Sequence, residues 1–104
     1  MSTALALAAV VLTAVTPSTL DAVHVGDTRR TAETTIGSHG WYKVTFWDER
    51  GREIKVRWYS TGDPLARASV LYRVGKRHDR VQSTQWCTRP AKGSGVWTCG
   101  QVTP

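Results

Sequence analysis

The sequence predicts a small α+β domain: an antiparallel sheet in the order β-β-α-β-β, with one helix packed on a face and one disulfide. Three observations predict this class. Residues 41–59 alternate apolar and polar side chains around a turn, residues 63–75 start and end with helix signals, and two cysteines lie in the last fifth of the chain. With 104 residues, the chain has room for one domain, but not for a barrel enzyme or a full dinucleotide-binding fold.

Residues 1–22 form an apolar leader that is predicted to be a signal peptide. Residues 4–15 are apolar with one exception, and no charged side chain precedes Asp21. Twelve helical residues rise about 18 Å, short of the roughly 30 Å hydrocarbon core, so no stable membrane span is expected. Cleavage is expected after Ser18 or Ala22. Because the segment lacks the positive start of a signal peptide, a helix that packs on the domain is the alternative.

Cys87 and Cys99 are predicted to form a disulfide. Eleven residues separate them, and this spacing fits no common zinc site, which needs four ligands and usually closer pairs. Their bridge would stabilise the domain by about 3 kcal/mol in the chain-entropy model. Together with the leader, the pair predicts a secreted, periplasmic or cell-surface protein. The alternative is a cytoplasmic protein with two reduced thiols.

The most strongly patterned segment is a hairpin over residues 41–59. Its even positions are apolar in both halves: Tyr42, Val44 and Phe46 before the turn, and Ile54, Val56 and Trp58 after it. A three-residue loop that ends at Gly51, with that glycine in the left-handed region, pairs these residues in the order Phe46 with Ile54, Val44 with Val56 and Tyr42 with Trp58. We expect this even face to pack in the core.

Residues 63–75 are predicted to form the helix of the domain. Asp63 and Pro64 are residues typical of a helix start, and Gly75 is typical of a helix end. Residues 68–74 also alternate as a strand would, which leaves an all-β meander as the alternative fold.

The predicted domain spans residues 41–104. Residues 23–40 show no sustained period and are predicted to be irregular. The last two strands are expected over residues 80–87 and about 96–102, where the two cysteines would join them.

The odd positions of the hairpin form the candidate binding surface. In the predicted register they place Trp41 next to Tyr59, Lys43 next to Arg57, Thr45 next to Lys55, and Trp47 next to Glu53. Aromatic rings between cations suit the bases and phosphates of a nucleic acid, or an anionic glycan. A basic loop over residues 76–80 extends this surface. The candidate binding residues are Trp41, Lys43, Trp47, Lys55, Arg57, Tyr59, Arg77 and Arg80.

The charge of the chain favours an anionic partner. Fourteen Lys and Arg outnumber eight Asp and Glu, and all of these residues except Asp21 follow the leader. The partner is expected to be an anionic protein, glycan or nucleic acid. Ordinary surface cations are the alternative, because Lys and Arg often lie over tryptophan rings without any ligand. The oligomeric state is left open.

No motif predicts a catalytic residue, a metal ion or a cofactor. The three histidines lie apart from the cysteines, and the chain has neither a glycine-rich phosphate loop nor a G-x-S-x-G motif. We therefore expect a small exported binding module without enzymatic activity. One alternative is an intracellular nucleic-acid-binding accessory protein of a mobile element. Another is a small secreted hydrolase of the ribonuclease type, in which Glu53, His78, Arg57 and Arg80 would act.

Overall fold

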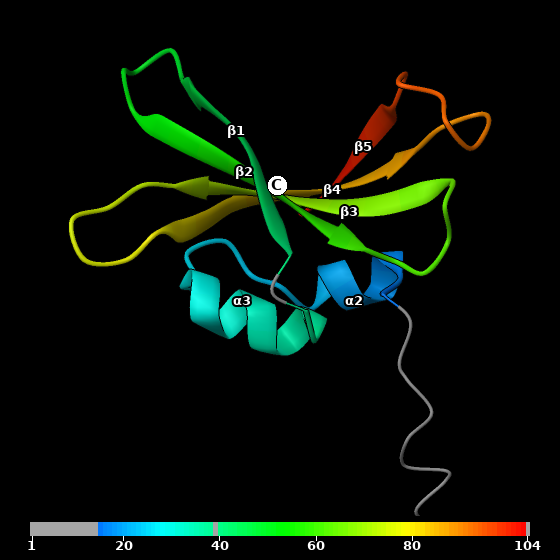
Figure 1. The fold of residues 1–104 in the computed structure, drawn as a ribbon. Helices are drawn as coiled ribbons and strands as arrows, with labels where there is room; N and C mark the ends of the chain where they lie inside the picture. The colour runs from blue at the N-terminus through cyan, green and yellow to red at the C-terminus, as the bar shows by residue number, and fades with distance from the viewer. Residues whose placement is uncertain (1–14, 39, 104) are drawn as a thin grey trace, which may run out of the picture.

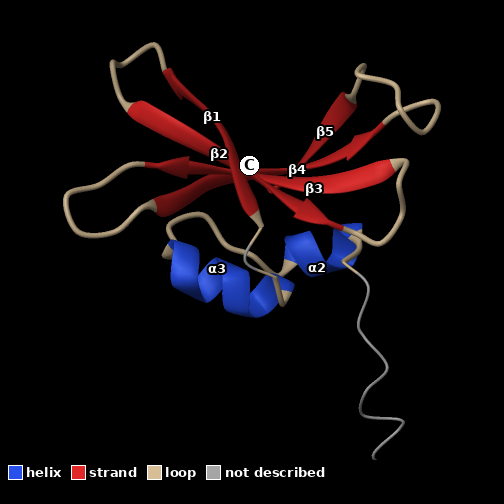
Figure 2. Cartoon of the chain, in the orientation of Figure 1, coloured by secondary structure: helices blue, strands red, loops and turns tan. Residues whose placement is uncertain are grey.

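The computed structural model describes residues 15–38 and 40–103 (Figure 1). Two short helices, α2 (Pro17–Asp21) and α3 (Arg29–Ile36), precede all the strands. The strands are β1 (Trp41–Trp47), β2 (Glu53–Ser60), β3 (Ala66–Arg73), β4 (Arg80–Thr88) and β5 (Thr98–Thr103). Each strand is antiparallel to its neighbours and the order in space follows the order in the chain, so the sheet is a five-stranded meander (Figure 2).

The predicted helix over residues 63–75 is wrong, and with it the β-β-α-β-β order. Most of this segment is β3, which pairs with β2 on one side and β4 on the other. The apparent helix start is a turn, in which an Asp63 carboxylate oxygen accepts the N–H of Leu65 at 2.8 Å. Asp-Pro begins turns as readily as helices. Two neighbouring strands then satisfy the main chain of β3 on both edges, which outweighs a weak local helix preference.

The prediction that residues 23–40 are irregular is also wrong, because residues 29–36 form α3. The hydroxyl of Thr28 caps this helix by accepting the N–H of Thr31 at 3.2 Å, and Gly37 ends it with a φ of 82°. Of its residues only Ala32 and Ile36 are buried. Two buried positions are too few to produce a visible apolar period in the sequence.

Both helices lie on one face of the sheet and close the core there (Figure 1). The core residues from the helical part are Val15, Leu20, Val23, Ala32 and Ile36, and those from the sheet are Tyr59, Ala68, Val70, Tyr72 and Val81. We call this side of the sheet the covered face and the opposite side the open face.

The end of the predicted leader is part of this core. Leu20 is fully buried and Val15 is 8% exposed. A cut after Ser18 would divide α2, and a cut after Ala22 would remove Leu20 from the core. The rest of the predicted leader, residues 1–14, lies outside the described residues. In the part of the chain that the structure describes, no helix is long and apolar enough to cross a membrane.

The predicted hairpin register is confirmed beside the turn. Phe46 pairs with Ile54 and Val44 with Val56, and Gly51 has a φ of 76°. The Asp48 carboxylate accepts the main-chain N–H groups of Arg52 and Arg50, at 2.8 and 2.9 Å, and the Arg52 Nε–H. These donors, the Arg52 main-chain N–H first among them, hold the pKa of Asp48 below its ordinary value, although partial desolvation opposes them.

Farther from the turn, the predicted pairs are wrong. The register shifts between Tyr42 and Val44, so Trp41 pairs with Trp58, and Tyr42 with Arg57. The expected pairs Tyr42 with Trp58, Trp41 with Tyr59, and Lys43 with Arg57 therefore do not form. The reason is a β-bulge, which adds one residue to β1 and moves Trp41 to the other face of the sheet. There its ring meets the Trp58 ring edge to face, with centroids 6.3 Å apart.

Candidate functional site

Part of the hairpin face that was expected to bind a partner lies under α3. Tyr59 is fully buried, and its hydroxyl donates to Glu33 Oε2 at 2.9 Å. Arg57 Nε lies 3.2 Å from the same oxygen, and an Arg57 Nη2–H donates to the carbonyl oxygen of Gly40 at 3.3 Å. Only 18% of the Arg57 side chain is exposed. These two residues thus attach α3 to the sheet and are not available to a large ligand.

The buried tyrosine pair has a defined direction of hydrogen bonding. Tyr59 gives its single hydroxyl proton to Glu33, so the Tyr72 hydroxyl, 2.8 Å away, donates to Tyr59. Burial is the main cause that raises the pKa of both phenols, that of Tyr72 to about 12 and that of Tyr59 still further. Both hydroxyls therefore stay protonated in the physiological range and serve as structural donors.

The remaining candidates from the hairpin do not gather at one place. Trp41 lies on the open face and is 45% exposed, whereas Trp47, near the turn, is 67% exposed. Lys55 is half-buried and pairs with Tyr72 on β3. The side chain of Lys43 lies outside the described residues. The hairpin therefore does not present the continuous aromatic and cationic surface that its sequence pattern predicts.

The basic loop between β3 and β4, in contrast, meets a second basic segment at the start of α3 (Figure 1). Basic side chains from both segments surround two adjoining hollows of about 460 and 250 Å³, which share Arg77 and His78. We call these residues the cation cluster: Arg29, Arg30, Arg73, Lys76, Arg77 and Arg80, with His78 between them.

Main-chain hydrogen bonds hold the two segments of the cation cluster together. Gly26 N–H donates to the Val81 carbonyl and Val81 N–H to the Asp27 carbonyl, both at 2.8 Å, and Arg29 N–H donates to the Asp79 carbonyl at 3.1 Å. These bonds join the chain before α3 to the first residues of β4.

Side-chain geometry reinforces this junction. Arg80 Nη1–H donates to the Gly26 carbonyl at 2.9 Å. A Cβ at Gly75 would collide with the carbonyl oxygen of His78, so only glycine allows the loop to close this way. The relative placement of the cations is thus set by the fold and not by their own charge interactions.

The charge of the cation cluster is nearly unopposed. Asp79 is the only carboxylate among the described residues that line the two hollows. In the described part of the chain, Arg29 is the only one of these cations in an ion pair, with Glu33 at 3.9 Å. The first turn of α3 contains no acidic residue, and its main-chain N–H groups add positive partial charge at the same place. Guanidinium groups in such a setting bind phosphate, sulfate or carboxylate groups.

The ribonuclease-type constellation is not assembled around these hollows. Both hollows that contain His78 lack Glu53, and Arg57 is bound to Glu33 under α3. Among the described residues, no group of three or more His, Cys, Asp or Glu side chains could hold a metal ion.

The open face carries a stacked row of tryptophan and arginine side chains beside the disulfide. Arg67 Cζ lies 2.8 Å from the ring centroid of Trp58 and 3.9 Å from that of Trp97, and Arg89 Cζ lies 4.6 Å from the Trp97 centroid. We call this row the Trp–Arg ladder. Burial, together with the charge of Arg89, lowers the pKa of Arg67 to about 10. Because guanidinium groups of the same chain already contact these rings, the ladder is a structural feature.

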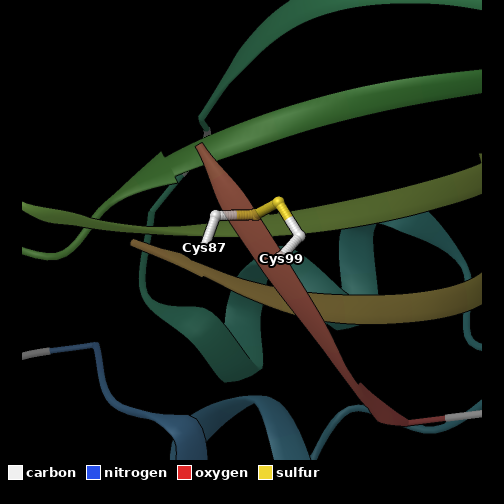
Figure 3. Close-up of a disulfide and its surroundings, with 2 residues drawn as sticks. All are labelled: Cys87 and Cys99. Carbon is white, nitrogen blue, oxygen red and sulfur yellow. A yellow bond between two sulfur atoms is a disulfide. The ribbon is translucent and has the colours of Figure 1, made fainter. Parts of the chain in front are cut away.

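The predicted disulfide between Cys87 and Cys99 is confirmed. It joins directly paired positions of β4 and β5, with an S–S distance of 2.04 Å (Figure 3). Cys87 is fully buried and pairs with Arg67 on β3, so the bridge lies on the open face next to the Trp–Arg ladder.

The sequence identified one half of the cation cluster and missed the other. Arg77 and Arg80 were candidates because five polar residues follow one another in the loop. Arg29 and Arg30 were not candidates. Their segment was expected to be irregular, so nothing in the sequence predicted that it would lie next to the basic loop. The signal was a Thr-Arg-Arg triplet at a helix start, which becomes visible only once α3 is recognised. Comparison with protein-family models, with curated proteins and with solved structures finds no match to this chain.

Proposed function

We propose that this protein is an exported binding module without enzymatic activity, which engages an anionic macromolecule through its cation cluster. The observation that carries the proposal is the convergence of six cationic side chains from separate segments around two hollows lined by one carboxylate. Main-chain hydrogen bonds hold these like charges close together, so the side chains repel one another. A bound anionic ligand would reduce this repulsion. The partner is expected to carry closely spaced phosphate, sulfate or carboxylate groups.

Export is supported by the disulfide and the apolar leader. A bridge between two neighbouring strands is compatible with an extracellular location, where such bonds persist. Residues 23–104 hold all the Lys and Arg of the chain, so the positive charge belongs to the domain and not to the leader. The alternative function for the same cluster is that of an intracellular nucleic-acid-binding protein. The disulfide argues against this alternative, because disulfides are rare in cytosolic proteins.

The test is a binding titration with two labelled polyanions, a heparin oligosaccharide and a single-stranded RNA, at several salt concentrations. Affinity should fall steeply between about 50 and 200 mM salt. The double variant Arg30→Ala/Arg77→Ala should weaken binding by about tenfold or more and reduce the salt slope by about two. The control is Arg50→Ala/Lys92→Ala, which removes the same charge from exposed positions outside the cluster.

Two results would contradict the proposal. If both double variants lose the same affinity, binding depends on net charge alone and not on the cation cluster. If the wild type binds neither polyanion, the proposed function is wrong. Preference for RNA over heparin would favour the intracellular alternative. Cleavage of the RNA by the wild type, lost in His78→Ala, would establish the hydrolase instead.

A further inference from the structure

We propose that the anionic macromolecule is a linear sulfated glycan, which lies along α3 from the cation cluster to a groove lined by hydroxyl groups. This inference rests on the proposed function, because it names the class of ligand that the same site binds. The observation that carries it is a row of hollows beside α3, whose lining changes from cationic side chains at one end to hydroxyl groups at the other.

Shared lining residues place these hollows in order along α3. Arg29 and Arg30 line one hollow of the cation cluster and also a third hollow of about 510 Å³. Thr34, Gly37 and Ser38 line this third hollow and also a fourth, of about 650 Å³. The eight residues of α3 rise about 12 Å, so a ligand that contacts both ends of the row has to be an extended chain.

The fourth hollow is lined mainly by side-chain hydroxyl groups. We call it the hydroxyl groove, and its hydroxyl-bearing residues are Thr19, Thr34, Thr35, Ser38, Ser60 and Thr61. Thr34 and Thr35 donate their hydroxyl protons to main-chain carbonyl oxygens, at 2.9 and 3.1 Å, and keep lone pairs that can accept. Ser38 and Ser60 accept main-chain N–H groups, at 3.2 and 3.4 Å, which leaves each hydroxyl proton to be donated. The groove therefore suits sugar hydroxyls, which both donate and accept.

The middle of the row does not oppose a polyanion. Glu33 is the one carboxylate among the described residues that line the third hollow. Its oxygens lie 3.2 Å from Arg57 Nε and 3.9 Å from Arg29 Nε, and only 11% of its side chain is exposed. Two guanidinium groups thus compensate its charge, so a sulfated chain can pass from the cation cluster to the hydroxyl groove.

A nucleic acid fits this row less well, because its bases would find no ring on which to stack. None of the described residues that line the four hollows is Phe, Tyr or Trp. Proteins usually hold single-stranded RNA by stacking its bases on aromatic side chains. The rings of Trp41, Trp58 and Trp97 lie on the open face, and Tyr59 and Tyr72 are fully buried.

An acidic protein also fits less well, because the row offers no apolar anchor. The centre of a stable protein interface is usually formed by aromatic and other apolar side chains. Val15 and Ile36 are the large apolar residues among the described lining of the hydroxyl groove, and they are only 8% and 5% exposed. A sulfated glycan needs no such anchor, because its sulfates bind guanidinium groups and its hydroxyls bind the groove.

The ligand class is tested with three probes: a heparin dodecasaccharide, a single-stranded RNA, and inorganic polyphosphate, which has neither sugars nor bases. Heparin is expected to bind most tightly. Thr34→Val/Ser38→Ala removes two hydroxyls from the row and should weaken heparin binding by about fivefold or more, but polyphosphate binding by less than about twofold. Retained polyphosphate binding shows that this variant is folded. The control Thr98→Val/Ser94→Ala should change neither affinity, although Ser94 Oγ accepts a main-chain N–H as Ser38 Oγ does.

The outcomes separate the ligand class from the proposed function. If Arg30→Ala/Arg77→Ala weakens heparin binding and Thr34→Val/Ser38→Ala does not, the cation cluster binds anions but the glycan inference is wrong. The same holds if polyphosphate binds as tightly as heparin. If RNA binds more tightly than heparin, the ligand is a nucleic acid and the glycan inference is again wrong. If Arg30→Ala/Arg77→Ala changes no affinity, the proposed function and this inference are both wrong.

Discussion

Each face of the sheet holds an arginine side chain that is partly shielded from water, and the contacts that shield it differ between the covered face and the open face. On the covered face, Arg57 meets a carboxylate at 3.2 Å that α3 supplies, more than twenty residues away in the chain. On the open face, Arg67 lies against the rings of Trp58 and Trp97. The first arrangement exists only when a helix docks, whereas the second uses residues from the sheet and the segment just before β5.

This difference teaches how a small sheet is stabilised without a second layer on one side. The covered face combines apolar burial with a hydrogen-bonded Glu33, Tyr59 and Tyr72 group. The open face relies on the Trp–Arg ladder and on the Cys87–Cys99 bridge. We therefore expect the covered face to respond most strongly to loss of volume, and the open face to loss of a covalent bond or of a planar cation.

The largest effect is expected from Leu20→Ala on the covered face. Leu20 is fully buried between the helices and the sheet, and truncation of such a residue costs about 2–5 kcal/mol. Val96→Ala is the control, since Val96 is 70% exposed and should change the free energy of unfolding by less than about 0.5 kcal/mol. Urea unfolding of both variants measures the difference. Equal effects would mean that α2 does not stabilise the sheet.

Loss of the disulfide should be the largest effect on the open face. Cys87→Ala/Cys99→Ala removes a bridge with a sequence separation of 12, for which the chain-entropy model gives about 3 kcal/mol. The measurement is thermal unfolding, with the wild type in reductant as the second arm. A stability that changes in neither arm would show that the sheet alone holds β5 in place.

Tyr59→Phe is expected to lower the free energy of unfolding by about 1–3 kcal/mol, because it leaves Glu33 and the Tyr72 hydroxyl without this partner in the core. The variant should also change the response to alkaline pH. The folded pKa of both tyrosines is raised, so their contribution is complete below their ordinary value of 10 and is lost as the pH rises beyond it.

Unfolding of the wild type and of Tyr59→Phe between pH 8 and about pH 12 measures this dependence. The variant should lose less stability over that range. Identical pH profiles would show that the phenol of Tyr59 ionises as it does in the unfolded chain, contrary to its burial.

The smallest of these effects is expected from Arg67→Lys in the Trp–Arg ladder. An ammonium group keeps the charge but cannot lie flat against two rings, so a loss of about 1 kcal/mol is expected. The near-ultraviolet circular dichroism of the tryptophans should change with it. Arg73→Lys, at an exposed position of the same strand, should change neither. A ladder variant indistinguishable from that control would show that the stacking contributes nothing to stability.

Local chemistry predicted the parts of the fold in which neighbouring residues act on each other. The turn at Gly51, the strand pairs next to it, the last two strands and the Cys87–Cys99 bridge could all be predicted from spacing and residue type. The β-bulge could not, because one extra residue in β1 leaves the alternation of the sequence intact. The bulge moved Trp41 to the open face, and α3 covers Arg57 and Tyr59, so the predicted hairpin surface does not form.

The candidate site divides in the same way. The loop with Arg77 and Arg80 could be predicted, since its composition is local. Its junction with Arg29 and Arg30 depends on main-chain bonds between residues about fifty positions apart, and no local pattern reports such bonds.

By itself, the sequence determined the basic charge, the paired cysteines and the hairpin turn, because each depends on residue type or on contacts over a few positions. Only the tertiary structure decided which face of the sheet is covered and which cations converge. Residues 63–75 became a strand because β2 and β4 offered partners on both edges. Arg57 became structural because α3 brought Glu33 to it. In each case a contact distant in sequence outweighed a local preference of about 1 kcal/mol or less.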